Sequence, residues 1–315
     1  MNKTIVIHHS ADYDGLFSRE VARKFLPPDT QFIGWDFGDP LICLDGFEGT
    51  CYIIDLSPDC LKSPYWEGKD IIWIDHHKSS IEKWPKDIPG YRIDGVAACR
   101  LAWQWFCLKD KSWKEGDGAT PPNPNKGFYV LPTKEDFVNR EVCEPLAVRL
   151  AGEYDVWDHR DPRDVPFQFG LDTEIDHNDL MFEWLLKPEA DIYVQQILAQ
   201  GKCAMACYKR RDSEVMKGRS FVTQFEGLKF LCLNVARCNS QTFDARDIPE
   251  TGHDALMAFF WNGKGWTVSL YHAKHNTSID LSLIAVKYGG GGHRGACGFR
   301  VGNLPGISEL PFISA

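Results

Sequence analysis

Long apolar runs are missing from this chain of 315 residues. No stretch reaches the roughly 18 apolar residues that a membrane-spanning helix needs. The first eight residues, MNKTIVIH, also lack the apolar core and the small-residue cleavage site of a secretory signal peptide. We therefore expect a cytoplasmic protein with no membrane partner.

Cysteine pairs at metal-binding spacing are also scarce. The eleven cysteines are scattered and odd in number, which is typical of free thiols in a reducing compartment. Cys203 and Cys207 lie four residues apart on a predicted helix, but no second pair accompanies them, so we expect no structural zinc site. Hydrophobic residues make up 43% and charged residues 25% of the chain, which indicates an ordinary folded globular protein.

Positive charge is in short supply. The chain has 35 lysines and arginines against 44 aspartates and glutamates, a net charge of −9. Residues 1–180 contain 20 lysines and arginines against 32 aspartates and glutamates, a net charge of −12. Residues 181–315 contain 15 lysines and arginines against 12 aspartates and glutamates, a net charge of +3. A mildly basic C-terminal part can hold a few phosphates but offers little to a long backbone. We expect no long-duplex nucleic acid as a partner.

The N-terminal part alternates short β-branched runs with helical or loop segments. The run at 71–74 is almost continuously apolar, which indicates a strand buried on both faces, as in a parallel sheet covered by helices. The predicted class is therefore α/β, with helices on both faces of a parallel sheet and a ligand site beyond the carboxyl ends of its strands. We predict a helix at 15–26 and strands at 4–8, 31–35, 51–54 and 70–74.

The rest of the chain predicts a second, smaller α/β domain. The segment 109–133 is rich in Lys, Gly, Pro and Asn and is predicted to be an exposed insertion, either a lid or a plain surface loop. The predicted domains are 1–180, a helical linker at 181–217, and 218–315. Further predicted helices are 96–108, 136–152, 189–217 and 279–288, and further strands are 220–225, 229–235, 255–261 and 266–272.

Carboxylates and histidines follow three of the predicted strands. Neighbouring carboxylates repel one another and are costly to bury unless a cation lies between them, and a divalent metal is the usual solution. A mixed Asp/His set without thiolate suits Mn²⁺, Mg²⁺ or Fe²⁺, and so many ligands require two metals. The groups are His8-x-x-x-Asp12-x-Asp14, the single Asp55, and Asp75-His76-His77.

Each of these groups also has an ordinary explanation. Asp12 could be the N-cap of the helix that follows, and an aspartate after a strand is commonly a turn former. His9 is interpreted as a bystander. The order of the three groups, at one edge of one predicted sheet, is what favours a metal centre.

Four consecutive glycines precede His293 and Arg294. One or two glycines would suffice to end a helix. A run of four allows the backbone to approach a ligand closely and to present N–H groups to an anion. We therefore predict substrate binding by the glycine run and the two residues that follow it, namely Gly290, Gly291, Gly292, His293 and Arg294.

These motifs resemble those of the DHH phosphoesterases. His8-x-x-x-Asp12-x-Asp14 matches the first motif of that family, Asp55 the second and Asp75-His76-His77 the third, while Asp155 is the best match to the fourth. The GGGGH run resembles the signature of the DHHA1 domain that accompanies DHH in one branch. Residues 33–36 and 53–57 look most like the oligoribonuclease and nanoRNase B type.

The resemblance implies a site in the cleft between two domains, with two Mn²⁺ ions. Asp55 would bridge the ions, Asp75 would orient a ligand histidine, and His77 would bind phosphate or protonate the leaving oxygen. One ion would take His8, Asp12 and Asp55, and the other would take Asp14, Asp55, His76 and Asp155. The implied activity is hydrolysis of short oligoribonucleotides, or of a similar small nucleotide phosphodiester, to 5′-mononucleotides.

The sequence departs from the family where Tyr271 and His272 replace the usual arginine of a Ser-Leu-Arg-Ser strand. A phosphate contact is lost there unless Lys274 or Arg294 supplies it. Other substrates therefore stay open, namely 3′-phosphoadenosine 5′-phosphate, a cyclic mono- or dinucleotide, or a single-stranded DNA end. A nucleotide-binding module without catalysis is the alternative of another class, and a homodimer is one assembly that the sequence allows.

Overall fold

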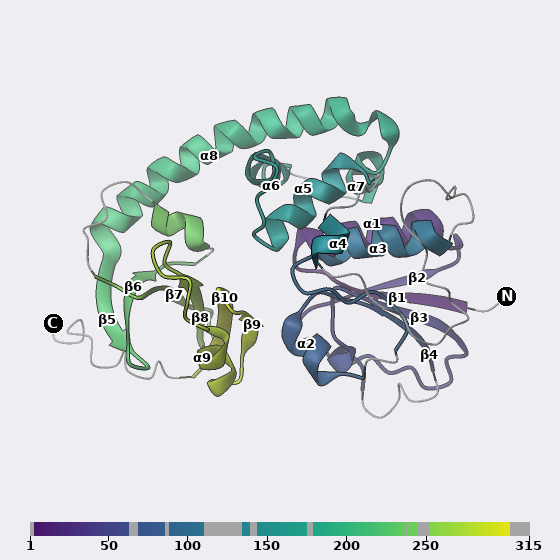
Figure 1. Cartoon of the computed structure of the whole chain (residues 1–315), viewed down its shortest axis with the longest axis horizontal. Coiled ribbons are helices and arrows are strands. Elements are labelled where there is room, and N and C mark those ends of the chain that lie inside the picture. Colours follow the sequence, from purple (N-terminus) through teal and green to yellow (C-terminus); the bar gives the residue numbers. More distant parts are fainter. Residues whose placement is uncertain are drawn as a thin grey trace. The chain divides into compact units, whose positions relative to one another are not determined.

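The computed structural model describes residues 3–62, 69–85, 88–109, 134–138, 144–174, 179–236, 238–244 and 252–302. The chain divides into two compact units, Met1–Ala204 and Met205–Ala315 (Figure 1). Across the described ranges, no helix combines the length and the apolar character needed to cross a bilayer.

The first unit is built on a sheet of four parallel strands. Their order across the sheet is β2-β1-β3-β4, and β1 and β4 both pair in parallel with β3 (Figure 1). The predicted parallel sheet is confirmed, and the predicted strand bounds differ from the observed ones by at most two residues. The strands are β1 (Lys3–His9), β2 (Gln31–Trp35), β3 (Gly49–Ile54) and β4 (Asp70–Ile74).

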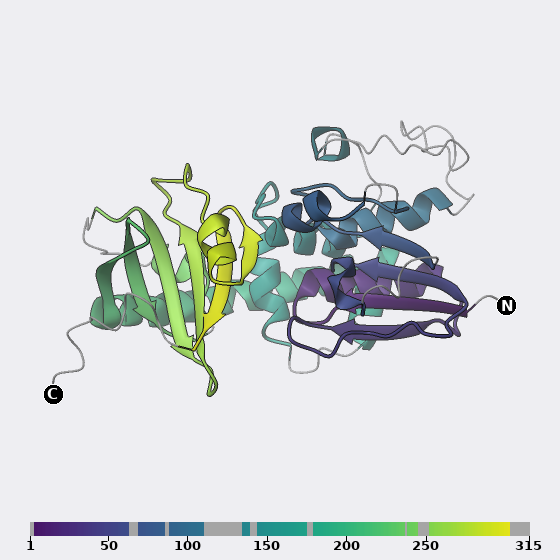
Figure 2. The same cartoon turned by 90° about the horizontal axis from the view of Figure 1, so that it is seen from below.

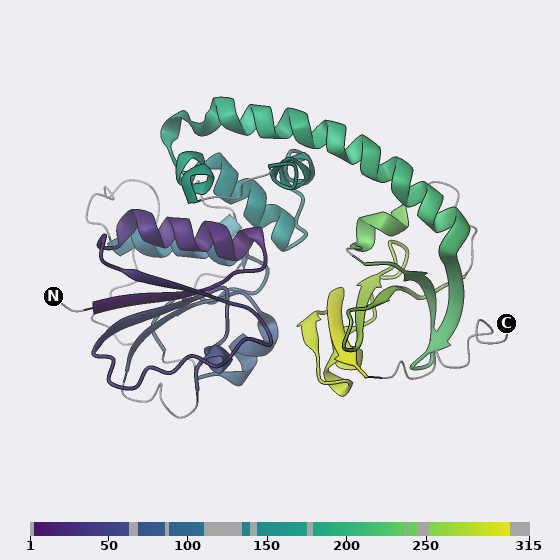
Figure 3. The same cartoon turned by 180° about the vertical axis from the view of Figure 1, so that it is seen from behind.

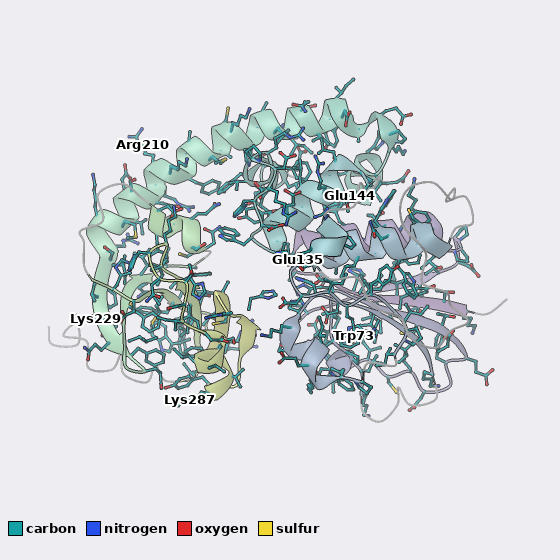
Figure 4. All side chains as sticks on the ribbon, viewed as in Figure 1. Trp73, Glu135, Glu144, Arg210, Lys229 and Lys287 are labelled. Atoms are coloured by element: carbon teal, nitrogen blue, oxygen red, sulfur yellow. The ribbon has the colours of Figure 1, made fainter. Side chains whose placement is uncertain are left out.

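Both faces of this sheet are buried. On one face, Val6 and Ile54 pack against the helices α1 (Tyr13–Phe25) and α3 (Ala98–Lys109) (Figure 3). On the other face, the fully buried Trp73, labelled in Figure 4, packs with Ile53 under loop residues such as Leu44. Burial on both faces explains why these strands are nearly continuous apolar runs.

Local sequence sets the ends of α1. The Asp12 side chain accepts a hydrogen bond from the Gly15 amide and caps the N-terminus, as the N-cap interpretation predicted. Pro27 follows the C-cap residue Leu26, and a proline cannot continue the helical hydrogen bonds. The first turn of α1 is thereby fixed directly after β1, beside the carboxyl edge of the sheet.

A layer of further helices completes the first unit. The predicted single helix at 136–152 is wrong, because α4 (Lys134–Val138) ends before α5 (Leu146–Asp155) begins. Pro145 is the N-cap of α5 and has no N–H with which to extend a helix from the preceding segment. The insertion predicted at 109–133 lies, beyond Lys109, outside the described residues. The short helix α6 (Asp164–Leu171) was not predicted from the sequence, whereas α7 (Asp179–Leu185) overlaps the start of the predicted helical linker at 181–217.

The second unit contains a mixed sheet of six strands in the order β5-β6-β7-β8-β10-β9 (Figure 2). Among the described strands of this second sheet, only β6 and β7 pair in parallel, and the other pairings are antiparallel. The helix α9 (Ser282–Lys287) packs on one face, and the end of α8 (Asp191–Arg219) packs on the other through Met216. The strands are β5 (Ser220–Phe225), β6 (Leu228–Asn234), β7 (Ala255–Trp261), β8 (Trp266–His272), β9 (Gly291–His293) and β10 (Ala296–Val301).

The glycine run enters this sheet. Gly289 has a φ of +78° just after α9, and the chain then forms β9, which pairs with β10. A Cβ on Gly290 would lie 2.0 Å from the carbonyl oxygen of Gly298, so the close packing of these strands requires glycine there. The run is therefore both a helix stop and a short strand.

Candidate metal centre

The carboxyl ends of β1, β3 and β4 meet at one edge of the first sheet. His8 pairs in register with Ile54, and Ile54 pairs with Ile74, so the residues that follow these strands are neighbours. Asp55 has a φ of 61° and donates its backbone N–H to the Ile74 carbonyl over 2.9 Å. A left-handed backbone at a non-glycine residue is uncommon, and such residues cluster at functional sites.

Three carboxylates surround the His76 ring at this edge. Its Nε2 lies 3.2 Å from Asp55 Oδ1, 3.4 Å from Asp14 Oδ2 and 3.4 Å from Asp155 Oδ2. His76, Asp14 and Asp55 are each about 2% exposed. The structure thus unites side chains from the start of α1, the ends of β3 and β4, and the end of α5.

The crowding of these groups perturbs their pKa values. Burial, with the nearby Asp55 charge, raises the pKa of Asp14 to about 7. Burial and Asp14 likewise raise the pKa of Asp155 well above its usual range. Burial alone would lower the pKa of His76, but the three carboxylates raise it well above normal. In the absence of metal, protons therefore supply the positive charge that these carboxylates need.

The N-terminus of α3 fixes the Asp14 carboxylate. The Ala98 N–H donates to Asp14 Oδ2 over 2.8 Å, and the Cys99 N–H donates to Oδ1 over 2.7 Å. The first amides of a helix have no partner within the helix and carry partial positive charge. Asp14 is thus held in one orientation, and each of its two carboxylate oxygens keeps a further lone pair that can bind a cation.

A second cluster contains His9, Asp12 and Asp55. His9 Nδ1 lies 2.8 Å from Asp12 Oδ2 and 3.5 Å from Asp55 Oδ2. Its Nε2 lies 3.3 Å from Asp36 Oδ1, just after β2. Burial lowers the pKa of His9, but the contacts with Asp12 and Asp55 outweigh it and raise this pKa to about 11. Asp55 belongs to both clusters.

The structure separates the two adjacent histidines of the first motif. His8 is buried, its Nδ1 bonds the His9 carbonyl over 2.8 Å, and burial lowers its pKa to about 4. Successive side chains of a strand point to opposite faces, so only one of the pair can reach Asp12 and Asp55. Within the described chain, the clusters that could hold a metal include His9 and not His8. Sequence reasoning took His9 for a bystander.

Asp75 organises the residues of the DHH tripeptide. Its Oδ1 accepts hydrogen bonds from the backbone N–H of His76 over 2.7 Å and from His77 Nδ1 over 2.7 Å. Asp75 is completely buried, whereas the His77 side chain is 29% exposed. Burial lowers the pKa of His77, but its hydrogen bond to Asp75 raises it above the usual value. His77 therefore presents its other ring nitrogen from a fixed orientation.

The predicted substrate-binding residues lie in the second unit. Arg294 donates to the Ser278 carbonyl, and His293 pairs with Ala296 between β9 and β10. Tyr271, at the place of the family arginine, donates its hydroxyl to the Cys238 carbonyl over 2.8 Å. Lys274 forms an ion pair with Asp244 over 2.8 Å. Their role in binding stays a prediction.

The donor set fits divalent metals. Within the described ranges, Asp12, Asp14, Asp55 and Asp155 make ion pairs with histidines and with no lysine or arginine. The Oδ2 atom of Asp55 is buried and accepts no hydrogen bond from the described residues. Four carboxylates without a fixed cation match two divalent ions in charge, and oxygen and imidazole donors suit Mn²⁺ or Mg²⁺.

A comparison with family models gives no match. An uncharacterized protein, R106 of Acanthamoeba polyphaga mimivirus, is 27% identical over 256 residues, which cover 76% of this chain and 49% of that protein. The chain thus spans about half the length of this curated relative.

Two solved structures are similar over most of this chain. RecJ from Thermus thermophilus in complex with Mn²⁺ is 13% identical and has a TM-score of 0.49, with 95% of this chain and 50% of that chain covered. The pGpG-specific phosphodiesterase PggH from Vibrio cholerae is 14% identical and has a TM-score of 0.44, and the match covers 95% of this chain and 93% of PggH. The order of the motifs and the sheet edge at which they meet resemble those expected of the DHH phosphoesterases, the family that the sequence motifs resemble.

Proposed function

We propose that this chain is a metal-dependent phosphodiesterase that hydrolyses short oligoribonucleotides, or a similar small nucleotide phosphodiester, to 5′-mononucleotides. The observation that carries the proposal is the sharing of Asp55 between two clusters, His9–Asp12–Asp55 and Asp14–Asp55–His76–Asp155. A carboxylate shared by two neighbouring clusters is suited to a pair of closely spaced metal ions.

The two clusters would hold two Mn²⁺ ions, and Mg²⁺ has the same preference for oxygen donors. We assign His9 to the first ion in place of His8, because His9 is the histidine beside Asp12 and Asp55. When bound, such ions would lower the pKa of a water molecule and neutralise charge on the phosphate. The other tasks fall to residues of the chain.

His77 is the proposed proton donor. Its Nδ1 is bound to Asp75, so Nε2 is the nitrogen that would face a phosphate oxygen or the leaving oxygen. The hydrogen bond to Asp75 raises the pKa of His77, which favours the protonated ring that a general acid requires. Asp75 acts through His77 by fixing its orientation.

Substrate length is proposed from charge and from the glycine run. The segment 181–315 has a net charge of only +3, which suits a few phosphates. We propose that Gly290, Gly291, Gly292, His293 and Arg294 bind the nucleotide that is cleaved. Backbone N–H groups of a glycine run are suited to an anion.

A hydrolysis panel tests this function. With Mn²⁺, the wild-type chain is compared on a dinucleotide, a pentamer, a long single strand, 3′-phosphoadenosine 5′-phosphate and a cyclic dinucleotide. We expect release of 5′-mononucleotide, faster from the dinucleotide than from the long strand. Asp14→Asn and Asp55→Asn should abolish it, while the exposed Asp29→Asn, before β2, is the matched control.

The panel also separates the alternatives. Preference for 3′-phosphoadenosine 5′-phosphate or for the cyclic dinucleotide would replace the oligonucleotide assignment while keeping the chemistry. Equal rates on long and short strands would contradict the size limit. Nucleotide binding without turnover of any substrate would establish a binding module.

A further inference from the structure

An exposed phenylalanine stands on a hydrogen-bonded turn beside the second cluster, the one that contains His9, Asp12 and Asp55. In the turn after β2, Phe37 N–H donates to Asp36 Oδ1 over 2.7 Å, and Asp36 N–H donates to Asp39 Oδ2 over 2.9 Å. Asp39 N–H also donates back to the Asp36 carbonyl over 3.0 Å. Gly38 has a φ of 108°, a conformation that favours glycine. The Phe37 ring is nevertheless 61% exposed.

Two rings support Phe37 from the protein side. The His9 ring lies 6.0 Å from it between centroids at an interplanar angle of 70°, and the Trp35 ring lies at 5.5 Å and 68°. Trp35 is buried in the core of the first unit, and its Nε1–H donates to the Pro40 carbonyl. Near-perpendicular aromatic contacts of this kind fix the plane of a ring. Phe37 is therefore held in contact with a residue of the second cluster.

We infer that Phe37 is a stacking platform for the nucleobase next to the phosphate that is cleaved. This inference rests on the proposed function. Aromatic side chains stack on any base, because every base has a π-face. A ribose separates the base from its phosphate, so a base would lie beside the metal ligands and not on them, as Phe37 does relative to His9.

The charge around the ring favours a base over another phosphate. Asp36 and Asp39 flank Phe37 in the sequence, and the Asp36 side chain is 45% exposed. A polyphosphate chain would bring further negative charge next to these carboxylates, which repel it. A base instead offers a neutral face and amino groups that can donate hydrogen bonds to carboxylates. The platform thus selects nucleotides over inorganic polyphosphates.

Trp157 is the rival platform. It is 46% exposed, has a φ of 57° and lies two residues after Asp155. Its described ring contacts are with Tyr154 and His159, neither of which belongs to the clusters around Asp55. Phe37 is preferred because it contacts His9 directly.

The test compares a dinucleotide with its abasic counterpart, which lacks one base but keeps the phosphodiester. Phe37→Ala should raise KM and the dissociation constant for the dinucleotide about 10-fold, leave kcat within about twofold and leave the abasic compound unaffected. Phe37→Trp should restore wild-type values. Trp184→Ala, at an exposed tryptophan on α7, is the matched control, and Mn²⁺ affinity checks that the second cluster is intact.

Three results would overturn the inference. They are an unchanged dissociation constant in Phe37→Ala, an equal loss on the abasic compound, and a loss confined to Trp157→Ala. If the wild type binds the dinucleotide but hydrolyses nothing, the proposed function fails, and the dissociation constants still decide the role of Phe37. A wild type that neither binds nor hydrolyses the dinucleotide overturns both.

Discussion

The Nδ1 atom of His9 lies 2.8 Å from the Oδ2 atom of Asp12, while the adjacent His8 bonds a backbone carbonyl. The same Asp12 caps α1 through its other oxygen, over 3.0 Å to the Gly15 N–H. One carboxylate therefore fixes the start of a helix and contributes to a candidate metal site. The double role explains why the N-cap interpretation and the ligand interpretation of Asp12 do not exclude one another.

Substitutions of His8 and His9 should have different effects on the affinity for Mn²⁺. His9→Ala removes an imidazole from the second cluster and should weaken Mn²⁺ binding by about 100-fold or more, since loss of even a supporting residue costs about 10- to 100-fold. His8→Ala should leave Mn²⁺ affinity within about threefold and lower the free energy of unfolding by about 2 kcal/mol, because it removes a buried ring. Electron paramagnetic resonance of free Mn²⁺ measures the first and thermal unfolding the second. The reverse pattern would return the ligand role to His8.

The amide that Ala98 donates to Asp14 can be deleted without breaking α3. Ala98 is the first helical residue, where proline is well tolerated because its N–H is not needed within the helix. Ala98→Pro should lower Mn²⁺ affinity about 10-fold, since Asp14 then loses one of two donors that orient it.

Ala98→Gly keeps the amide and serves as the control. It should retain wild-type Mn²⁺ affinity with a slightly lower melting temperature. If both variants lose affinity equally, the packing of Ala98 matters and its N–H does not.

Metal binding should strengthen as the pH rises. In the metal-free protein, burial and the Asp55 charge raise the pKa of Asp14 to about 7, and the contacts with Asp12 and Asp55 raise that of His9 to about 11, so near pH 7 His9 is protonated and Asp14 is about half protonated. A folded-state pKa above the unfolded one gives stability at low pH that is lost as the pH rises through the folded value. From pH 6 to pH 8 the metal-free protein should therefore lose stability through Asp14, and Mn²⁺ should restore it.

Calorimetry in buffers of different ionisation enthalpy measures the protons released when Mn²⁺ binds. Release of at least one proton at pH 7, with a larger gain in melting temperature at pH 8 than at pH 6, is the expected outcome. Binding without proton release would show that Asp14 and His9 are not ligands.

The sequence alone located most of the sheet and the residues at its edge. Strands buried on both faces are apolar at every position, so Ile71 to Ile74 predicted a buried strand, and Asp75 was placed at its end. The same property hid which of the two histidines lies beside Asp12 and Asp55. Residues 4 to 7 of β1 show no alternation of polar and apolar side chains, so the sequence does not say which strand residues face the same side of the sheet. The different surroundings of His8 and His9 are visible only in the three-dimensional structure.

Other features depended on contacts that local patterns do not contain. Asp14 accepts from amides 84 and 85 residues further along the chain. The strand β9 consists of two glycines and a histidine, which have little strand preference and are held by β10. Pro145, in contrast, was a visible break in the predicted helix at 136–152 and could have corrected it.

The hydrogen bond between Asp75 and His77 should control the rate of the chemical step. In Asp75→Asn the amide can still accept from His77 Nδ1, but the negative charge that raises the pKa of His77 is lost. We expect kcat to fall about 100-fold, as for loss of a general acid, with KM and Mn²⁺ affinity little changed. The alkaline limb of the pH–rate profile should move to lower pH, because a less basic His77 loses its proton at a lower pH.

The control is a double-variant cycle. His77→Gln should have a kcat similar to that of Asp75→Asn, and the double variant should be no slower than either single variant, since both changes remove the same function. An additive loss, or a large loss of Mn²⁺ affinity in Asp75→Asn, would instead place Asp75 in support of the metal ligands.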